Sequence, residues 1–220
     1  MSIGARDDIL GRVRSALGRT ADNRAGAVAE VEMALAARTR GPRPVAPTDP
    51  VARFRAEGKR MSSTLDEVAS LEDVPAAVGR YLASCDLPRQ AVAWPKLAVL
   101  DWRGAGLDVV SRSVTADDPV GITGCFCAIA ETGTLMLCSG PETPAATSLL
   151  PETHIAVVPV SRIVAGMEEA WTLLRAECGA VLPRAVNFVS GPSRTGDIEM
   201  TIVLGAHGPY RVHLLLVNDV

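Results

Sequence analysis

Apolar residues recur along the chain with two different periods. Helical spacing predicts helices over residues 3–17 and 25–38, and around Ile163–Leu174. Short apolar runs bounded by Gly and Pro predict strands at 91–94, 97–100, 107–110, 154–160, 185–189 and 210–217. Strands interleaved with helices predict an α/β fold, a layered sheet flanked by helices with an antiparallel pair inserted.

A proline-rich stretch divides the chain. The segment 41–50 contains Pro42, Pro44, Pro47 and Pro50, which can continue neither a helix nor a central strand. We therefore predict an N-terminal helical arm over residues 1–40, a linker over 41–50 and an α/β domain over 51–220. The arm is expected to dock on the main domain or on another subunit.

The stretch 121–141 combines two apolar runs around a polar tip. Ala128 to Ala130 leads into Glu131-Thr132-Gly133-Thr134, and Leu135 to Leu137 leads out. This pattern predicts a β-hairpin with Gly133 at a position of positive φ. The tip offers a carboxylate, two hydroxyls and backbone N–H groups to a ligand, although an ordinary polar turn is equally consistent with it.

A second informative stretch, 190–199, leaves a predicted strand, makes a Gly-Pro turn and is expected to enter a helix over 197–204. A strand–loop–helix directs backbone N–H groups and the helix dipole at an anion. Arg194 is placed for a two-pronged contact with a carboxylate or phosphate. The alternative is capping alone, with Ser193 or Thr195 as the cap and Asp197 at the helix start.

Histidine and cysteine usage narrows the chemistry. His207 stands in a Gly205–Pro209 loop as a candidate acid/base, whereas His154 and His213 are expected to be structural. No pair of histidines has metal-ligand spacing. Five cysteines without a CxxC pair argue against a disulfide framework, a zinc ribbon or an iron–sulfur cluster held by this chain. Cys125 and Cys127 are expected to be small buried side chains.

Charge and hydropathy exclude several classes of protein. Twenty-two basic and 25 acidic residues give a net charge of -3, which indicates neither nucleic-acid binding nor a polybasic membrane surface. No apolar run approaches the roughly 20 residues of a membrane span. The amino terminus carries charges where a signal peptide needs its apolar run. We expect a cytoplasmic protein.

Several motifs in order resemble one known family. The segments ITG, AIAETGTL, SGP, LLPETHIAVV, FVSGPSRTGDIE and LGAHGP are similar to the lactate utilization protein C family, which carries the LUD domain. The amino-terminal DDILGRVRSALG resembles the opening helix of that family. The segment 124–127, Gly-Cys-Phe-Cys, departs from it, because an Ala-Asp type of pair is expected there.

The resemblance implies a fold and a site. The fold implied is that of the NagB/RpiA/CoA-transferase group, with its ligand site at strand ends. One pocket is then expected to be lined by residues of the two informative stretches, with His207 and Gly208 at its rim. The lining residues are Glu131, Thr132, Gly133, Thr134, Ser193, Arg194, Thr195 and Asp197.

The resemblance also implies a function. The family is associated with a system that oxidises L-lactate to pyruvate, whose partner proteins hold iron–sulfur clusters, with none held by this chain alone. The chain is then a subunit that binds a small carboxylate, with a homo-oligomer also possible. Two alternatives stay open: a stand-alone CoA-transferase-like or isomerase-like enzyme, with Glu131 as base or nucleophile towards a phosphorylated or CoA-linked substrate, and a non-catalytic anion-sensing module.

Overall fold

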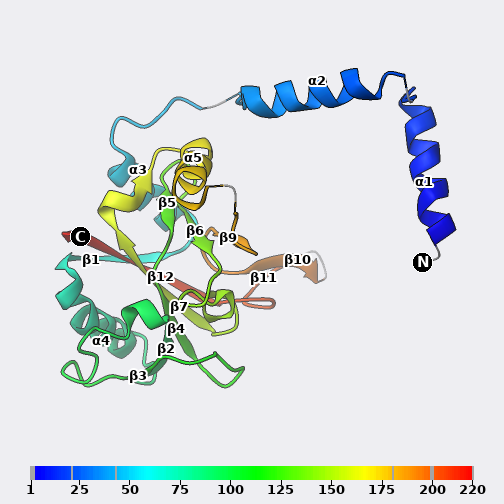
Figure 1. The fold of residues 1–220 in the computed structure, drawn as a ribbon. Helices are drawn as coiled ribbons and strands as arrows, with labels where there is room; N and C mark the ends of the chain where they lie inside the picture. The colour runs from blue at the N-terminus through cyan, green and yellow to red at the C-terminus, as the bar shows by residue number, and fades with distance from the viewer. Residues whose placement is uncertain (1–2, 21, 43, 180, 199–200, 220) are drawn as a thin grey trace. The chain divides into compact units, whose positions relative to one another are not determined.

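The computed structural model describes residues 3–20, 22–42, 44–179, 181–198 and 201–219 (Figure 1). The chain forms two compact units, residues 1–44 and 45–220. The first unit contains α1 (Ile3–Ala16) and α2 (Arg24–Ala37), which confirm the two predicted helices of the arm. Gly18 follows α1 with a φ of 60°, and no residue of α2 is buried within the unit described.

The second unit is built on a six-stranded parallel sheet with the order β1-β12-β7-β4-β2-β3. Its strands are β1 (Thr64–Ser70), β12 (Arg211–Asp219), β7 (Thr153–Pro159), β4 (Val120–Thr123), β2 (Gln90–Ala93) and β3 (Asp108–Val110). The α/β prediction is therefore confirmed.

A second sheet contains the predicted hairpin. It has the order β8-β5-β6-β9, with β5 (Cys127–Ile129) and β6 (Thr134–Cys138) antiparallel. Strands β8 (Ile163–Val164) and β9 (Val186–Val189) complete it. The start of the helix predicted near Ile163 is thus strand, and α5 spans Met167–Cys178.

Alternating side chains along the parallel strands build two apolar layers. On one face, Leu215 and Val217 of β12 pack with α4 (Val74–Ser84). On the other face, Leu214 and Leu216 pack with Phe54 of α3 (Pro50–Arg60) and with β5 and β6. Helix α5 covers the outer side of the second sheet, where it packs against Ile129 and Met136. The unit is therefore layered, as Figure 1 shows, with α3 and the hairpin on the same face of the parallel sheet.

Two predicted elements are wrong. Residues 97–100 are not a strand, because Pro95 has no N–H for a sheet ladder and opens the 3₁₀ turn η2 (Pro95–Leu97). The helix predicted over 197–204 is a two-stranded antiparallel ribbon of β10 (Arg194–Ile198) and β11 (Thr201–Leu204). β-Branched residues dominate that segment, and Thr201, Ile202 and Val203 favour strand over helix. Further 3₁₀ turns are η1 (Leu71–Asp73), η3 (Ala145–Ser148) and η4 (Val160–Arg162).

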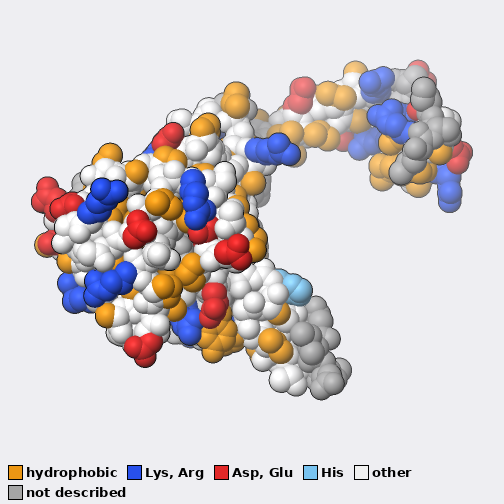
Figure 2. Space-filling view, turned by 90° about the horizontal axis from the view of Figure 1, so that it is seen from below, with side chains coloured by type: hydrophobic (Ala, Val, Ile, Leu, Met, Phe, Trp, Pro, Cys, Tyr) orange, Lys and Arg blue, Asp and Glu red, His pale blue; other side chains and the backbone are white. Residues whose placement is uncertain are grey.

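Charges are mixed on the surface of the second unit. Figure 2 shows Lys and Arg side chains interspersed with Asp and Glu side chains on the face that it presents. Within the described part of the chain, no helix is long and apolar enough to cross a membrane.

Candidate functional site

The hairpin tip lies against the carboxyl-terminal end of α3. Gly133 has a φ of 63°, which confirms the predicted left-handed position. A Cβ placed on Gly133 would lie 2.5 Å from the backbone nitrogen of Gly58 and 2.6 Å from the carbonyl carbon of Glu57. Glycine is therefore required at position 133 for two reasons. Its backbone has a positive φ, and the hairpin tip approaches the end of α3 too closely for a side chain.

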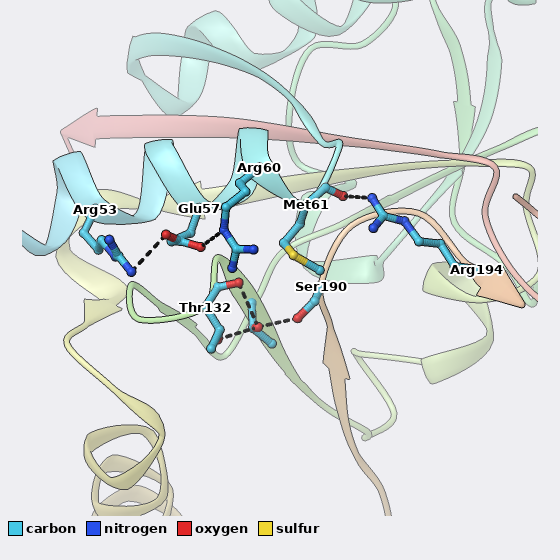
Figure 3. A network of polar contacts seen from close by, with 8 residues as sticks. Arg53, Glu57, Arg60, Met61, Thr132, Ser190 and Arg194 are labelled. Atoms are coloured by element: carbon cyan, nitrogen blue, oxygen red, sulfur yellow. Dashed lines mark hydrogen bonds and ion pairs between the residues drawn. The ribbon is translucent and has the colours of Figure 1, made fainter. Parts of the chain in front are cut away.

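Three hydroxyl groups gather beside this contact. Oγ1 of Thr132 and Oγ1 of Thr134 are 2.7 Å apart, and Oγ1 of Thr134 also hydrogen-bonds Oγ of Ser190 (Figure 3). Thr134 is buried, Ser190 is half-buried and Thr132 is exposed. Ser190 opens the stretch 190–199 but was not among the predicted site residues.

The end of α3 forms the other side of the site. Backbone nitrogens of Ser62 and Ser63 donate to the carbonyls of Lys59 (2.9 Å) and Gly58 (3.0 Å), the pattern of a Schellman motif. Ser62 occupies the left-handed position of that motif, with a φ of 67°, where glycine is usual. The turn therefore exposes the Met61 carbonyl and the Ser62 hydroxyl to the neighbouring loop.

Arg194 docks on that turn. Its Nη2 donates to the carbonyl oxygen of Met61 at 3.0 Å, as Figure 3 shows. The same Nη2 donates to Oγ of Ser62 at 2.7 Å. Gly191, with a φ of 72°, packs so closely on the same turn that a Cβ there would overlap the Met61 carbonyl oxygen. Both bonds use Nη2, so Nε and Nη1 take no part in them.

Ionic groups of α3 complete the arrangement, which we call the α3–hairpin site. The Glu57 side chain is 7% exposed, and its carboxylate contacts Arg53 at 2.9 Å and Arg60 at 2.5 Å. Figure 3 shows Arg60 lying above the tip residue Thr132. This part of the site was not predicted from the sequence, in which the only local signal for it is the dense run of charges Arg-Phe-Arg-Ala-Glu-Gly-Lys-Arg at 53–60. Guanidinium groups beside hydroxyls are suited to binding a carboxylate.

Of the other predicted site residues, Glu131 lies at the hairpin tip, whereas Thr195 and Asp197 lie in a strand. Glu131 is half-buried at the tip, and its backbone nitrogen donates to the carbonyl of Ala165 at 3.0 Å. Thr195 and Asp197 belong to β10, so neither Ser193 nor Thr195 caps a helix. The anion site predicted at a helix amino terminus is therefore wrong, and any ligand must be held by side chains and loop backbone instead.

His207 and Gly208 line a different cavity. This cavity, of about 450 Å³, lies at the amino ends of the parallel strands, and its lining residues include Asp117, Asp118 and Glu152. Arg112, bound to Asp118 through two hydrogen bonds of 2.6 and 2.7 Å, holds the pKa of that carboxyl well below its usual range. The described lining includes neither Arg194 nor any residue of the tip.

Ser193 connects the Arg194 loop with the loop around His207. Its nitrogen donates to the carbonyl of Pro209 and its carbonyl accepts from the nitrogen of Gly205, both at 2.9 Å. Gly208 packs directly on Ser193, since a Cβ on Gly208 would lie 3.2 Å from that of Ser193. The loop around His207 is thus a neighbour of the Arg194 loop, although Arg194 does not line the cavity beside His207.

The cysteines are free thiols. Cys127 is buried, as expected, and Cys125 is half-buried. Burial raises the pKa of both thiols to about 12, so they are protonated at neutral pH. Among the residues that the structure describes, no three His, Cys, Asp or Glu side chains are grouped so as to hold a metal ion.

Comparison with known proteins identifies relatives of this chain. It is 37% identical over 131 residues to lactate utilization protein C of Bacillus licheniformis, covering 57% of this chain and 54% of that protein. It is 37% identical over 142 residues to lactate utilization protein C of an Exiguobacterium species, covering 64% and 62%. The matched part thus spans little more than half the length of these relatives.

A solved structure and a family model agree with these matches. A DUF162 family protein from Deinococcus radiodurans has the same fold, with a TM-score of 0.61 over 79% of this chain and 99% of that one, at 24% identity. The LUD domain model matches residues 61–217, which contain the hairpin, the Arg194 loop and the parallel sheet except for the last two residues of β12. This chain belongs to the LUD domain family.

Proposed function

We propose that this protein takes part in lactate utilization, as one component of an iron–sulfur system that oxidises L-lactate to pyruvate. Its membership of the LUD domain family and its similarity to proteins named lactate utilization protein C support this role. The iron–sulfur clusters belong to partner proteins in this proposal. Cluster binding takes four cysteine thiolates in most proteins, whereas burial raises the pKa of the Cys125 and Cys127 thiols and keeps them protonated.

Within that system, the chain binds a small carboxylate at the α3–hairpin site. The observation that carries this part is the meeting of the 131–134 tip and the Arg194 loop on one turn of α3. Arg194 supplies a guanidinium edge that is not used by Met61 or Ser62. A guanidinium group binds a carboxylate through charge-assisted hydrogen bonds.

The experiment is thermal unfolding of the purified chain with L-lactate, pyruvate, CoA and a sugar phosphate, each in a separate titration. A ligand at a hundredfold excess over its dissociation constant stabilises by about 2.7 kcal/mol. For a chain of this size, that corresponds to a rise of roughly 5–10 °C in Tm. We expect the rise with L-lactate or pyruvate only.

Variants locate the binding. The rise is expected to disappear in Arg194→Ala, to persist in part in Arg194→Lys, and to be unchanged in Arg103→Ala, an exposed arginine on another loop. A rise with CoA or a sugar phosphate alone would point instead to a stand-alone enzyme. A lactate response that survives in Arg194→Ala would place the carboxylate elsewhere.

A further inference from the structure

A second cavity lies at the carboxyl edge of the parallel sheet. It measures about 620 Å³ and opens where β2, β4 and β7 end, since Trp94 follows β2, Gly124 follows β4 and Pro159 closes β7. Open α/β sheets bind ligands at this edge. None of the predicted site residues lines the cavity.

The walls of the cavity are held in place by hydrogen bonds. The Trp94 indole nitrogen donates to the carbonyl of Pro144 at 3.0 Å, and the Thr143 hydroxyl donates to the carbonyl of Cys138 at 2.7 Å. Nε of Arg162 donates to the carbonyl of Phe126 at 2.8 Å, and its guanidinium carbon lies 4.9 Å from the centre of the Phe126 ring. The cavity is thus formed before any ligand arrives, as is usual for small-molecule sites.

The lining combines aromatic surface with a positive charge. Trp94 and Phe126 supply the aromatic side chains. Arg162 is bound to Glu177 through hydrogen bonds of 2.7 and 3.1 Å, so these two charges balance. Lys96 is an exposed residue of the lining and has no counter-charge among the lining residues, so the net charge of the cavity lining is positive. An apolar body with one negative group matches this lining.

The volume indicates the size of the occupant. A water molecule takes about 30 Å³ of liquid, so the cavity holds the equivalent of about twenty waters. A three-carbon acid such as lactate would fill only a small part of it. A bicyclic or larger organic acid fills it far better.

We propose that this cavity binds an organic monoanion with a planar, apolar body of cofactor size, its charged group held by Lys96 at the mouth and its ring system against Trp94 and Phe126. The site is separate from the α3–hairpin site and does not depend on the lactate assignment. Naphthalene-2-carboxylate has the required charge and shape and serves as the probe.

Thiols in the lining report occupancy directly. Cys138 and Cys178 line the cavity and are half-buried, whereas Cys85 is a half-buried thiol that follows α4. Burial raises the pKa of the Cys138 thiol to about 11, so its alkylation is slow enough for rates to be compared. The experiment measures modification of each cysteine of the full chain by N-ethylmaleimide, using peptide mass spectrometry.

The expected result is selective protection. Naphthalene-2-carboxylate slows modification of Cys138 and Cys178 at least threefold and leaves Cys85 unchanged, while L-lactate at the same concentration protects neither. In Lys96→Gln, three to ten times more probe is needed for the same protection, and Lys59→Gln, the matched change at the other lysine of the chain, behaves as the wild type.

Several outcomes would overturn the proposal. One is the absence of protection at saturating probe. A second is equal slowing at Cys85, which would indicate a change in the whole fold rather than an occupied cavity. Equal protection by uncharged 2-naphthalenemethanol would remove the role of the anion, and equal protection by lactate would make this the small-acid site instead.

Discussion

Nη2 of Arg194 lies 2.7 Å from Oγ of Ser62, a residue 132 positions earlier that has a left-handed backbone. A residue other than glycine in that conformation costs on the order of 1 kcal/mol. Ser62 stands where glycine is usual and carries the hydroxyl that glycine lacks. Backbone strain at the end of α3 and the position of Arg194 are therefore linked through one side chain.

Ser62→Gly separates these two effects. Relief of strain and loss of the Arg194 hydrogen bond oppose each other, so we expect the free energy of unfolding to change by less than about 1 kcal/mol. Lactate affinity is expected to fall roughly threefold to tenfold, because Arg194 loses an anchor. Urea unfolding and lactate titration measure the two quantities. Ser62→Ala, which keeps the strain and loses the hydroxyl, should lose the same affinity and be less stable than Ser62→Gly.

Gly133→Ala tests the seating of the hairpin tip on α3. The added methyl would meet the backbone of Glu57 and Gly58, so we expect the free energy of unfolding to fall by more than about 2 kcal/mol. The left-handed φ by itself would cost only on the order of 1 kcal/mol. A loss no larger than that in urea unfolding would contradict the close approach.

Glu57→Gln tests the electrostatics of the site. The substitution keeps the shape of the side chain and removes the counter-ion of Arg53 and Arg60, whose side chains are 50% and 66% exposed. We expect a modest loss of stability, on the order of 1 kcal/mol, and tighter carboxylate binding that vanishes in high salt. Glu67→Gln, which breaks the exposed pair with Arg55, is the control. Weaker binding by Glu57→Gln would show that the carboxylate is needed for the geometry of the site.

Two buried histidines make the fold sensitive to acid. Burial lowers the pKa of His154 and of His213 to about 4, from an ordinary value of 6.5. Between these values the unfolded chain binds protons that the folded chain does not, so a falling pH favours unfolding. The contribution of these histidines to stability falls as the pH drops through 6.5, and the loss reaches on the order of 3 kcal/mol for each histidine near pH 4.

His213→Phe isolates one of the two groups. Phenylalanine keeps the stacking on Tyr81, whose ring centre lies 3.8 Å from that of His213, but it does not titrate. Between pH 5 and 6.5 we expect the slope of stability against pH to fall from about two protons to about one. Urea midpoints at several pH values give this slope, and an unchanged slope would exclude His213 as a source of the acid sensitivity.

The sequence by itself determined the features that depend on neighbours along the chain. Apolar periodicity predicted α1, α2, most of α5, the buried strand now called β7 and the β5–β6 hairpin. The burial of alternate or helically spaced side chains follows directly from local backbone geometry. Gly133 was predicted correctly for the same reason, since a tight tip needs a residue with positive φ. The order of the motifs was sufficient to indicate the LUD domain family. The NagB/RpiA-like likeness stays a prediction.

Tertiary structure alone decided the site. Ser62 and Arg194 meet only because the loop before β10 packs on the end of α3, which no local pattern encodes. The turn residues before the 194–204 segment predict the start of a helix. In the structure β10 pairs with β11, and the hydrogen bonds of this ribbon satisfy the backbone N–H and C=O groups instead. The carboxyl-edge cavity likewise depends on strand order, because residues following β2, β4 and β7 converge only when those strands lie side by side. Contacts of this kind are set by packing between distant segments rather than by the propensity of each segment.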